Sequence, residues 1–519
     1  MDEKNIYLKE VYANLPRIIS FFDSDITSKS YGTGNRYYWA WSLIDFSNAT
    51  FQGAVHGMAR LWTQKLWPYE TDQIVFIKRI DSIFNGTRNL TRKDGSLEES
   101  FPNEGSFCVT ALVAFDLLCT LELLDTYIEE NCTMRWQDCI RPMIKFLIES
   151  DETHGLISNH LATAAAALAR WHKITNDVRA EKKSKILLDR ILANQSSEGW
   201  FREYQGADPG YQSLCTYYLA DLHMVRPDWN LELPLRRSLQ FLQYFVHPDG
   251  SFGGIYGSRC TRFYYPGGIL SLSNTIPEAK ILSEFMINSI SKNHTVTLSA
   301  IDEPNLIPMF NAYVLAAIIQ KEKTHVLVGT VPAQSNQPFR KWFPEAGILI
   351  DRGLSHYSIV STNKGGVVYH FVENKQVLID TGIVVSNSRG RLGSSQGYSL
   401  DNLISWSGDQ LEIKSNITSM TKKISGPFQF LIIRLLSLTL FRFRFIREQF
   451  KKILVILLVS KRKIWPVKIK RKILLGKNLD IEDFVELKKG YCIVPKPGKF
   501  ISIHTASQGY WQIQDEKEK

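Results

Sequence analysis

The first 325 residues alternate between two kinds of helical pattern. One kind is small and apolar on nearly every side, as in residues 109–124 and 159–169. The other kind carries apolar residues at helical spacing along one side only, as in residues 136–148 and 182–192. This alternation predicts pairs of helices, in which an apolar helix lies inside and an amphipathic helix covers it.

Short glycine loops separate these helix pairs. Each loop has an acid or a histidine, then a glycine, any residue and an apolar residue, at positions 94–97, 154–157, 198–201 and 249–252. Their spacing of roughly 45 to 60 residues is typical of a helical array that curves, either a solenoid or a closed α/α toroid. In a toroid, such loops would bring the N-termini of the inner helices to one side.

A turn-rich linker marks the end of the helical part. It includes the proline-flanked segment 331–338, and beyond it the pattern changes to short runs rich in β-branched and aromatic residues. These runs predict strands at 347–350, 356–361, 366–372, 376–379, 491–494 and 500–505. We therefore predict an α+β multidomain fold, with an α/α toroid over 1–325, a linker over 326–342 and an antiparallel β-sandwich domain over 343–519.

The positive charge of the chain is concentrated in one segment. Thirteen Lys or Arg and a single acid, Glu448, lie between Arg434 and Lys472, whereas the whole chain has a net charge of +10. Two apolar runs, 428–441 and 453–459, accompany these charges. Both are shorter than the roughly 18 residues needed to span a bilayer. We predict a basic, apolar helical insertion at about 427–472 that interrupts the β domain.

Three interpretations of this insertion remain open. Apolar faces edged with Lys and Arg, with Trp465 nearby, suit a segment that lies in an anionic membrane interface. An insertion packed on its own domain with a solvated basic rim would have the same composition. A nucleic-acid surface is the third interpretation, but no recognised binding motif accompanies the charge, so we expect no nucleic-acid partner.

The N-terminus and the cysteines indicate the compartment. The first residues lack a basic region followed by an apolar core, so we predict no secretory signal. The seven cysteines are scattered and form no Cys-x-x-Cys pair, which is typical of reduced cysteines in a cytosolic protein. The sequence shows no cluster of metal-ligating residues, and we expect no metal and no cofactor. The expected location is cytoplasmic, with peripheral attachment to the inner membrane face through the insertion.

Two predicted helix N-termini carry side chains that are able to bind an anion or transfer a proton. Ser158 is a candidate N-cap ahead of Asn159 and His160, and Asp208 is a candidate N-cap ahead of a proline and Tyr211. A helix N-terminus concentrates unpaired N–H groups and about half a positive charge. Two such ends, one repeat apart, would hold a carboxylate and stabilise a phenolate. At such an end we expect the His160 imidazole to stay neutral.

These residues resemble the heparinase II/III-like group of polysaccharide lyases. The match is the Asn159–His160 pair before an Ala-rich helix, followed after one helix pair by a tyrosine at a helix start. Segments 343–347, 364–366 and 377–382 are similar to the start of that group's β domain. The chain also resembles toroid proteins of glycan-assembly loci.

The resemblance implies an elimination reaction on an acidic glycan. In such lyases an Asn neutralises the uronate carboxylate, which acidifies the C5 proton, and a Tyr or His removes that proton. Carried over to this chain, Asn159 is the neutralising residue, His160 a catalytic or positioning imidazole, and Tyr211 the acid and base. Because an ordinary tyrosine has a pKa of about 10, it acts as a base only beside positive charge. Three arginines are candidates to supply that charge: Arg202, Arg259 and Arg262.

The β domain departs from the family's pattern. The lyases usually bring a further His from a strand, in a segment with two closely spaced His and an Asp. Here the corresponding stretch, 364–371, contains only His370, with His356 as the second candidate. The departure leaves two alternatives open: a uronate C5-epimerase, or a non-catalytic glycan-binding or assembly protein.

Aromatic and charged residues beside the glycine loops are typical of a sugar-binding cleft. Aromatic faces stack on sugar rings, and an arginine can pair with a uronate carboxylate through two hydrogen bonds. A packed core with paired charges would look similar. The predicted substrate-binding residues are Arg36, Tyr38, Trp39, Trp41, Glu104, Arg202, Glu203, Arg259, Arg262 and Tyr264. The expected partner is an acidic oligosaccharide or polysaccharide that is being assembled or processed at the cytoplasmic membrane face.

Overall fold

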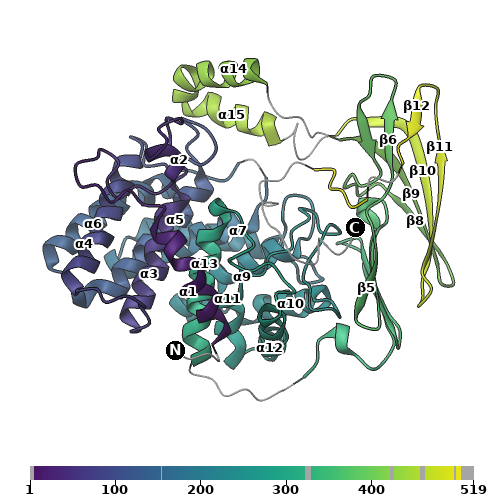
Figure 1. Ribbon diagram of the computed structural model, residues 1–519, viewed down its shortest axis with the longest axis horizontal. Coiled ribbons are helices and arrows are strands. Elements are labelled where there is room, and N and C mark those ends of the chain that lie inside the picture. The colour runs from purple at the N-terminus through teal and green to yellow at the C-terminus, as the bar shows by residue number, and fades with distance from the viewer. Residues whose placement is uncertain are drawn as a thin grey trace.

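The computed structural model describes residues 5–153, 155–321, 329–420, 426–455, 462–495 and 498–503. Helices form the first part of the chain, and two antiparallel sheets form the second (Figure 1). A helical hairpin leaves the β domain and lies against the first part, at the top of the figure. The predicted α+β class, a helical toroid followed by an antiparallel β domain, is confirmed.

Among the described residues, six helices form a closed inner ring. Each contacts the next, and the last contacts the first. Small side chains allow this close approach: α7 buries an almost unbroken run of alanines between Ala162 and Ala169. The ring consists of α3 (Ala54–Thr63), α5 (Phe107–Leu124), α7 (Ser158–Thr175), α9 (Pro209–Val225), α11 (Pro266–Ser271) and α13 (Glu303–Lys321).

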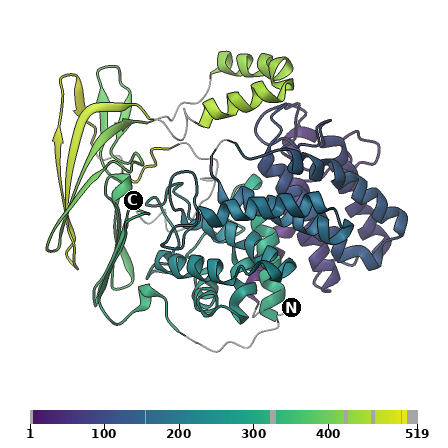
Figure 2. The ribbon, with the colours of Figure 1, turned by 180° about the vertical axis from the view of Figure 1, so that it is seen from behind.

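A second set of helices covers the outside of this ring (Figure 2). The amphipathic α6, for example, buries Trp136, Ile140, Met143 and Leu147 on one side, at the spacing expected for a helix packed along one face. The predicted alternation of apolar inner and amphipathic outer helices is confirmed. The outer helices are α1 (Ile6–Ile19), α4 (Gln73–Leu90), α6 (Glu130–Glu149), α8 (Val178–Ala193), α10 (Glu232–Leu242) and α12 (Pro277–Ser291).

The inner helix α5 is the most apolar helix of the ring. Together with the turn after it, Phe107–Tyr127 is the one described helix long and apolar enough to cross a membrane. However, 83% of its most apolar window is buried inside the protein. It is therefore a core helix of the ring.

The glycine loops lead from each outer helix to the next inner helix. Gly95, Gly199 and Gly250 have φ angles of 85°, 102° and 91°, a region that residues with a Cβ rarely adopt. A Cβ on Gly95 would also lie 2.0 Å from the carbonyl oxygen of Pro142. The first residue of the second loop, His154, lies outside the described residues. These tight turns place the inner-helix N-termini on one side of the ring.

The β domain consists of two antiparallel sheets. The first has the order β1 (Phe339–Phe343), β2 (Ile348–Arg352), β3 (His356–Ser361), β4 (Val367–Val372) and β5 (Lys375–Asp380). The second has the order β11 (Asp480–Glu486), β10 (Ile464–Leu474), β9 (Gln410–Ser419), β7 (Leu392–Ser394), β6 (Val384–Asn387) and β12 (Tyr491–Ile493), with β8 (Leu403–Ser407) paired to β9.

The first sheet is buried on both faces. Leu349 and Val368 pack with Leu411 of the second sheet, whereas Ile350 and Tyr369 belong to the core shared with the toroid. Successive residues of a strand point to opposite faces. A shift of one residue therefore decides whether a side chain points into the sandwich or toward the helices.

Three predicted segments differ from the structure. Strand β1 begins at Phe339, inside the predicted linker 326–342. The predicted helical insertion 427–472 is helical as α14 (Pro427–Leu438) and α15 (Arg444–Val455), but Ile464–Leu474 is strand β10. Alternate residues of β10 are buried, so a period of two prevails over the high charge. Of the predicted strand 500–505, residues 500–503 form no strand and the rest lies outside the described residues.

Candidate functional site

The N-terminal ends of five inner helices converge on one cavity of about 290 Å³. Each end contributes a partial positive charge, which favours an anionic ligand, while Glu99 and Asp302 place two acidic side chains in the same lining. The side chains that matter for its chemistry are Cys108 from α5, Asn159 and His160 from α7, Tyr211 from α9, Tyr265 just before α11 and Asn305 from α13. The structure thus brings together Asn159, His160 and Tyr211, the residues that the sequence placed at two helix starts.

The two helix starts differ in how they are capped. Asp208 Oδ1 accepts the backbone N–H of Tyr211 at 3.2 Å, which confirms Asp208 as the N-cap of α9. Ser158 is not an N-cap, because α7 begins with Ser158 itself. Instead, the Ser158 hydroxyl donates to the carbonyl oxygen of Arg202 at 2.7 Å. This bond fixes the start of α7 against the next glycine loop.

His160 is paired with a buried carboxylate. Its Nδ1 lies 2.8 Å from Oε2 of Glu152. Burial lowers the pKa of His160, but Cys108 and Glu152 outweigh burial, and the pKa lies well above its ordinary value. The prediction of a neutral His160 is therefore wrong, because it overlooked Glu152, which lies in the loop just before α7 and faces the imidazole. His160 adds positive charge to the cavity.

A second buried carboxylate holds the Asn159 amide. Asn159 Nδ2 donates to Oε2 of Glu203 at 2.8 Å, and Glu203 is only 4% exposed. Glu203 was predicted to bind substrate. It lies behind Asn159 instead, and with Arg259 it lines a separate cavity of about 30 Å³ beside the β domain. Its role in the structure is to orient Asn159.

Arg259 is the arginine that the structure places beside Tyr211. Burial lowers the pKa of Arg259, but its interactions with Tyr211, Tyr204 and neighbouring carboxylates raise it above the ordinary value. The guanidinium also lies 4.8 Å from the centre of the Tyr204 ring. Of the other two candidates, Arg202 is exposed and Arg262 is half-buried; none of the three arginines is among the described residues that line the main cavity, but Arg259 interacts with Tyr211. Arg259 is therefore best placed to stabilise negative charge on Tyr211.

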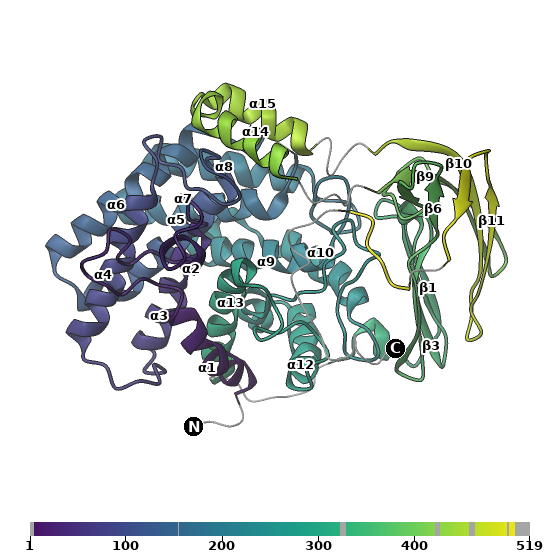
Figure 3. The same ribbon diagram turned by 45° about the horizontal axis from the view of Figure 1, so that its top comes forward.

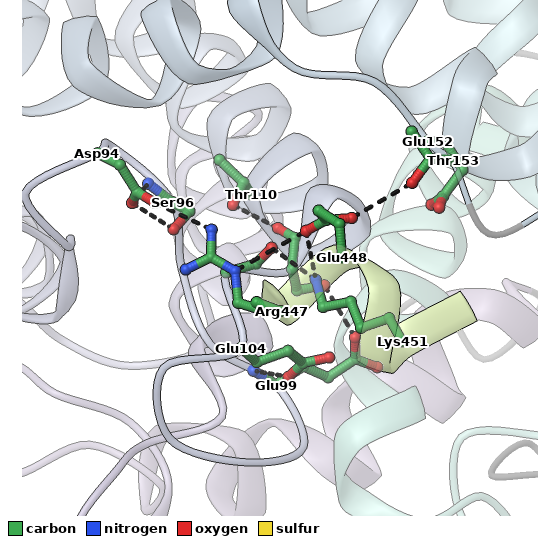
Figure 4. A network of polar contacts seen from close by, with 12 residues as sticks. Asp94, Ser96, Glu99, Glu104, Thr110, Glu152, Thr153, Arg447, Glu448 and Lys451 are labelled. Atoms are coloured by element: carbon green, nitrogen blue, oxygen red, sulfur yellow. Dashed lines mark hydrogen bonds and ion pairs between the residues drawn. The ribbon is translucent and has the colours of Figure 1, made fainter. Parts of the chain in front are cut away.

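Glu104, another predicted substrate-binding residue, supports a cavity residue that the prediction missed. Its Oε2 accepts the backbone N–H groups of Glu99 and Ser100 at 3.1 and 2.6 Å. Glu99 lines the main cavity, and burial together with the charge of Glu104 raises the pKa of Glu99 to about 7. Figure 4 shows the two carboxylates side by side. Glu99 is thus a proton donor or acceptor near neutral pH.

Tyr264 lies in the core instead of the cavity. It is completely buried, and its ring contacts Phe252 at 5.4 Å. The neighbouring Tyr265 lines the cavity. The prediction therefore chose the right segment but the wrong residue of it.

His370 does not reach the cavity either. Its Nδ1 lies 2.7 Å from the Ser358 hydroxyl, and its Nε2 lies 3.1 Å from the carbonyl oxygen of Lys477. On β4 it shares a face with Val368, toward the second sheet, because the intervening Tyr369 points to the helices. The second candidate, His356, is paired with Asp351 at 3.0 Å.

The aromatic residues near the N-terminus form a surface feature. Helix α2 (Arg36–Trp39) is a single turn, and the four predicted residues Arg36, Tyr38, Trp39 and Trp41 are exposed or half-buried. Trp39 Nε1 donates to the carbonyl oxygen of Phe21 at 2.7 Å. These residues are not among the described residues that line the cavity.

Several cavity residues were absent from the predicted site, among them Glu99, Cys108, Tyr265, Asp302 and Asn305. Cys108 lies in the first turn of α5, after the N-cap Ser106, and Tyr265 directly precedes α11. The repeat itself was the signal that could have identified them. If all inner helices start on one side, then the first turn of each helix is a candidate position, whatever its residue type.

Replacing Glu203 with Gln is expected to weaken the pH dependence of stability. Burial raises the pKa of Glu203 from 4.5 to about 7. The protonated Glu203 side chain therefore contributes stability that is fully present below pH 4.5. This contribution is lost as the pH rises through 7, because ionisation of Glu203 favours the unfolded state. At roughly 1.4 kcal/mol per pKa unit, the loss approaches about 3 kcal/mol at pH 8, and Gln avoids it.

Urea unfolding at pH 5 and pH 8 measures this difference. The control is Glu486→Gln on the exposed edge of β11, which should change little at either pH. Equal pH dependence in the wild type and in Glu203→Gln would contradict the prediction.

Neither a protein-family model nor a curated protein sequence matches the chain. Solved structures are similar to it. The chondroitin AC lyase of Streptomyces coelicolor A3 matches with a TM-score of 0.54 and 9% identity, over 81% of this chain and 65% of that one. Heparinase III matches with a TM-score of 0.50 and 13% identity, over 91% and 69% of the two chains. The chain thus spans about two thirds of the length of these lyases, and at these identities the likeness establishes the shared fold.

Proposed function

We propose that the protein acts on a uronate-containing glycan by removing the C5 proton and eliminating the substituent at C4. The observation that carries this proposal is the convergence of five helix N-termini on one cavity that also presents an amide, an imidazole and a phenol. The positive end charges attract a carboxylate, and the three side chains have the functions that elimination requires. The fold shared with polysaccharide lyases supports action on a glycan.

In this reaction the uronate carboxylate binds at Asn159 and His160. Neutralising that carboxylate makes the C5 proton more acidic, because the negative charge that develops on its loss is delocalised into the carboxyl group. The Tyr211 phenolate takes the proton. The electron pair of the C5–H bond forms the C4–C5 double bond, and the C4–O bond breaks. The Tyr211 phenol then returns its proton to the departing oxygen, which leaves one unsaturated uronate and one free hydroxyl.

The surrounding charges favour these roles. Arg259 interacts with Tyr211 and favours its phenolate form, and the end of α9 adds positive charge. Glu152 holds His160 and Glu203 holds Asn159, so both side chains are fixed before substrate arrives.

One observation favours C5-epimerisation as a second candidate. Epimerisation needs a proton donor that can return a proton to C5 after abstraction, without loss of the C4 substituent. Glu99 is a second titratable group of the cavity, and its pKa of about 7 suits proton donation at neutral pH. A non-catalytic glycan-binding protein would use the same anion-binding cavity without turnover.

Incubation with uronate-containing oligosaccharides in deuterated water separates these functions. Elimination produces new ultraviolet absorbance from the unsaturated uronate, whereas epimerisation incorporates deuterium at C5 without cleavage. Binding with neither signal supports the non-catalytic function, and absence of binding contradicts the proposal.

Replacing Asn159 with Asp is expected to abolish either reaction. The substitution keeps the shape of the side chain but replaces the N–H donor that bonds Glu203 with a carboxylate, so the group that would neutralise the uronate carboxylate is lost. We expect at least a tenfold weaker binding of the oligosaccharide, measured by calorimetry, because like charges repel in a partly dehydrated cavity. Asn305→Asp, at the α13 side of the same cavity, tests whether any added negative charge has this effect.

A further inference from the structure

The α14–α15 hairpin exposes an unusual amount of apolar surface. Ten large hydrophobic side chains between Pro427 and Val455 are 42–74% exposed. Surface patches of this kind mark interaction sites in soluble proteins. The exposed residues are Phe428, Phe430, Leu431, Ile432, Leu435, Leu438, Leu440, Phe443, Phe445 and Ile453.

The hairpin is held against the toroid in a defined orientation. Arg447, whose side chain is 1% exposed, pairs with Asp94 at 3.1 Å, and Lys451 Nζ donates to the carbonyl oxygen of Gly105 at 3.0 Å. Phe441 is buried, and its ring contacts the ring of Phe101 in a tilted arrangement, with the ring centres 5.8 Å apart. Figure 4 shows the charged part of this contact. Because the inner side is fixed, the apolar outer side is turned away from the protein.

Basic residues border the apolar surface. Arg442 is exposed and Lys452 is half-buried, whereas Arg444 Nη2 donates to the carbonyl oxygen of Glu149 on the toroid at 3.3 Å. The single acid of the two helices, Glu448, is turned inward, where its Oε2 lies 3.3 Å from the Thr153 hydroxyl. The outer side is therefore apolar and cationic, which complements a surface that has both an apolar interior and anionic head groups.

The length of the helices determines how they meet such a surface. Helices α14 and α15 have 12 residues each, well short of the roughly 20 residues that span a bilayer. A pair of short apolar helices with basic edges lies in the plane of the interface.

The aromatic loop around α2 lies next to the hairpin (Figure 3). Arg434 of α14 pairs with Asp45 at 2.7 Å, and Tyr37, Trp41 and Leu43 before this contact are 63%, 64% and 81% exposed. Tyr and Trp are enriched at membrane interfaces, because they present an apolar body and a polar tip. The loop that was predicted to bind sugar fits the same lipid surface.

We propose that the outer side of the α14–α15 hairpin, together with the 37–43 loop, docks on an anionic lipid surface and holds the cavity close to it. The link to the cavity is the segment 99–105. Glu99 and Ser100 line the cavity, while Phe101 and Gly105 of the same segment contact the hairpin. If the proposed function holds, the substrate is a uronate glycan presented at a membrane, such as a lipid-linked chain.

Vesicle flotation tests the docking directly. The full chain should float with vesicles of phosphatidylcholine and phosphatidylglycerol, bind pure phosphatidylcholine vesicles weakly, and release partly at high salt, since salt screens the basic edge. The triple variant Phe428→Ser, Leu431→Ser, Leu435→Ser should lose about tenfold or more of this binding. The matched control is Ile26→Ser, Leu354→Ser, Leu400→Ser, which changes equally exposed apolar residues elsewhere and should bind like the wild type.

Three outcomes would overturn the proposal. The first is no binding to anionic vesicles, and the second is equal binding by the hairpin variant and the wild type. The third is a dimer in light scattering that the hairpin variant dissociates, without vesicle binding, because a second copy would then cover the surface. Circular dichroism checks that both triple variants are folded. Failure of the oligosaccharide assay with intact flotation would contradict the proposed function and leave the docking supported.

Discussion

Tyr211→Phe is expected to reduce kcat on a uronate oligosaccharide by about 10²- to 10⁴-fold, the usual contribution of general acid–base catalysis. The hydroxyl is the group that would accept the C5 proton and return it to the leaving oxygen. The ring itself should keep its place, because it packs against Phe263 at 5.3 Å and its backbone N–H is held by Asp208. KM should change little, since the carboxylate contacts at Asn159 and His160 remain.

Initial rates of ultraviolet absorbance, or of deuterium incorporation at C5, measure the effect. Tyr217→Phe is a matched control, because Tyr217 is buried one and a half turns further along the same helix and is not among the described cavity residues. A Tyr211→Phe enzyme that retains kcat within a factor of about two would exclude Tyr211 as the acid and base.

Arg471→Met is expected to have the largest effect on stability, a loss of about 3–5 kcal/mol. The Arg471 guanidinium is buried between the two sheets and bonds Asp483 through Nε and Nη2, both at 2.7 Å. Its Nη1 bonds Asp380 at 2.7 Å and the carbonyl oxygen of Gly366 at 2.8 Å. Removing the guanidinium leaves a buried carboxylate without its partner, and desolvation then opposes folding.

Urea unfolding followed by fluorescence and circular dichroism measures this loss. The control is Arg141→Met, which removes a pair with Asp138 in which the side chains are 60% and 68% exposed. Exposed pairs contribute about 1 kcal/mol or less, so its unfolding midpoint should stay near that of the wild type. Similar midpoints for both variants would show that the cluster around Arg471 does not stabilise the β domain.

The cavity and the hairpin together account for the position of the basic residues. The positive charge of α14 and α15 does not line the cavity, where the positive potential comes from helix ends, His160 and the neighbouring Arg259. Arg447 and Lys451 face the toroid, whereas Lys452 and the neighbouring Arg442 lie on the outer side, beside apolar residues. Of the three interpretations of the basic segment, a packed insertion describes the inner side of α15, and the interfacial segment remains a proposal for the outer side.

The helical part was predictable because its determinants are local. The period of apolar residues, the N-cap at Asp208 and the glycines at left-handed turns depend on neighbouring residues in the chain. Strands β2 to β5 of the first sheet were equally predictable, since β-branched and aromatic runs between turn residues are local signals, whereas β1 was assigned to the linker. Strand β10 was missed because its lysines hide the alternation of Val467, Ile469, Arg471 and Ile473, all buried in the folded domain.

The sequence by itself determined that this protein is an array of helix pairs followed by an antiparallel β domain, and that Asn159, His160 and Tyr211 begin inner helices. Tertiary structure decided which side chains meet. Glu203 reaches Asn159 from the next glycine loop, and Glu152 folds back onto His160 from the loop before α7. Tyr264 and His370 each adjoin a residue that points the other way. Tyr264 therefore lies in the core, and His370 points into the sandwich. Helix and strand periods are short-range properties, whereas the pairing and charge of a buried group depend on neighbours that only folding brings near.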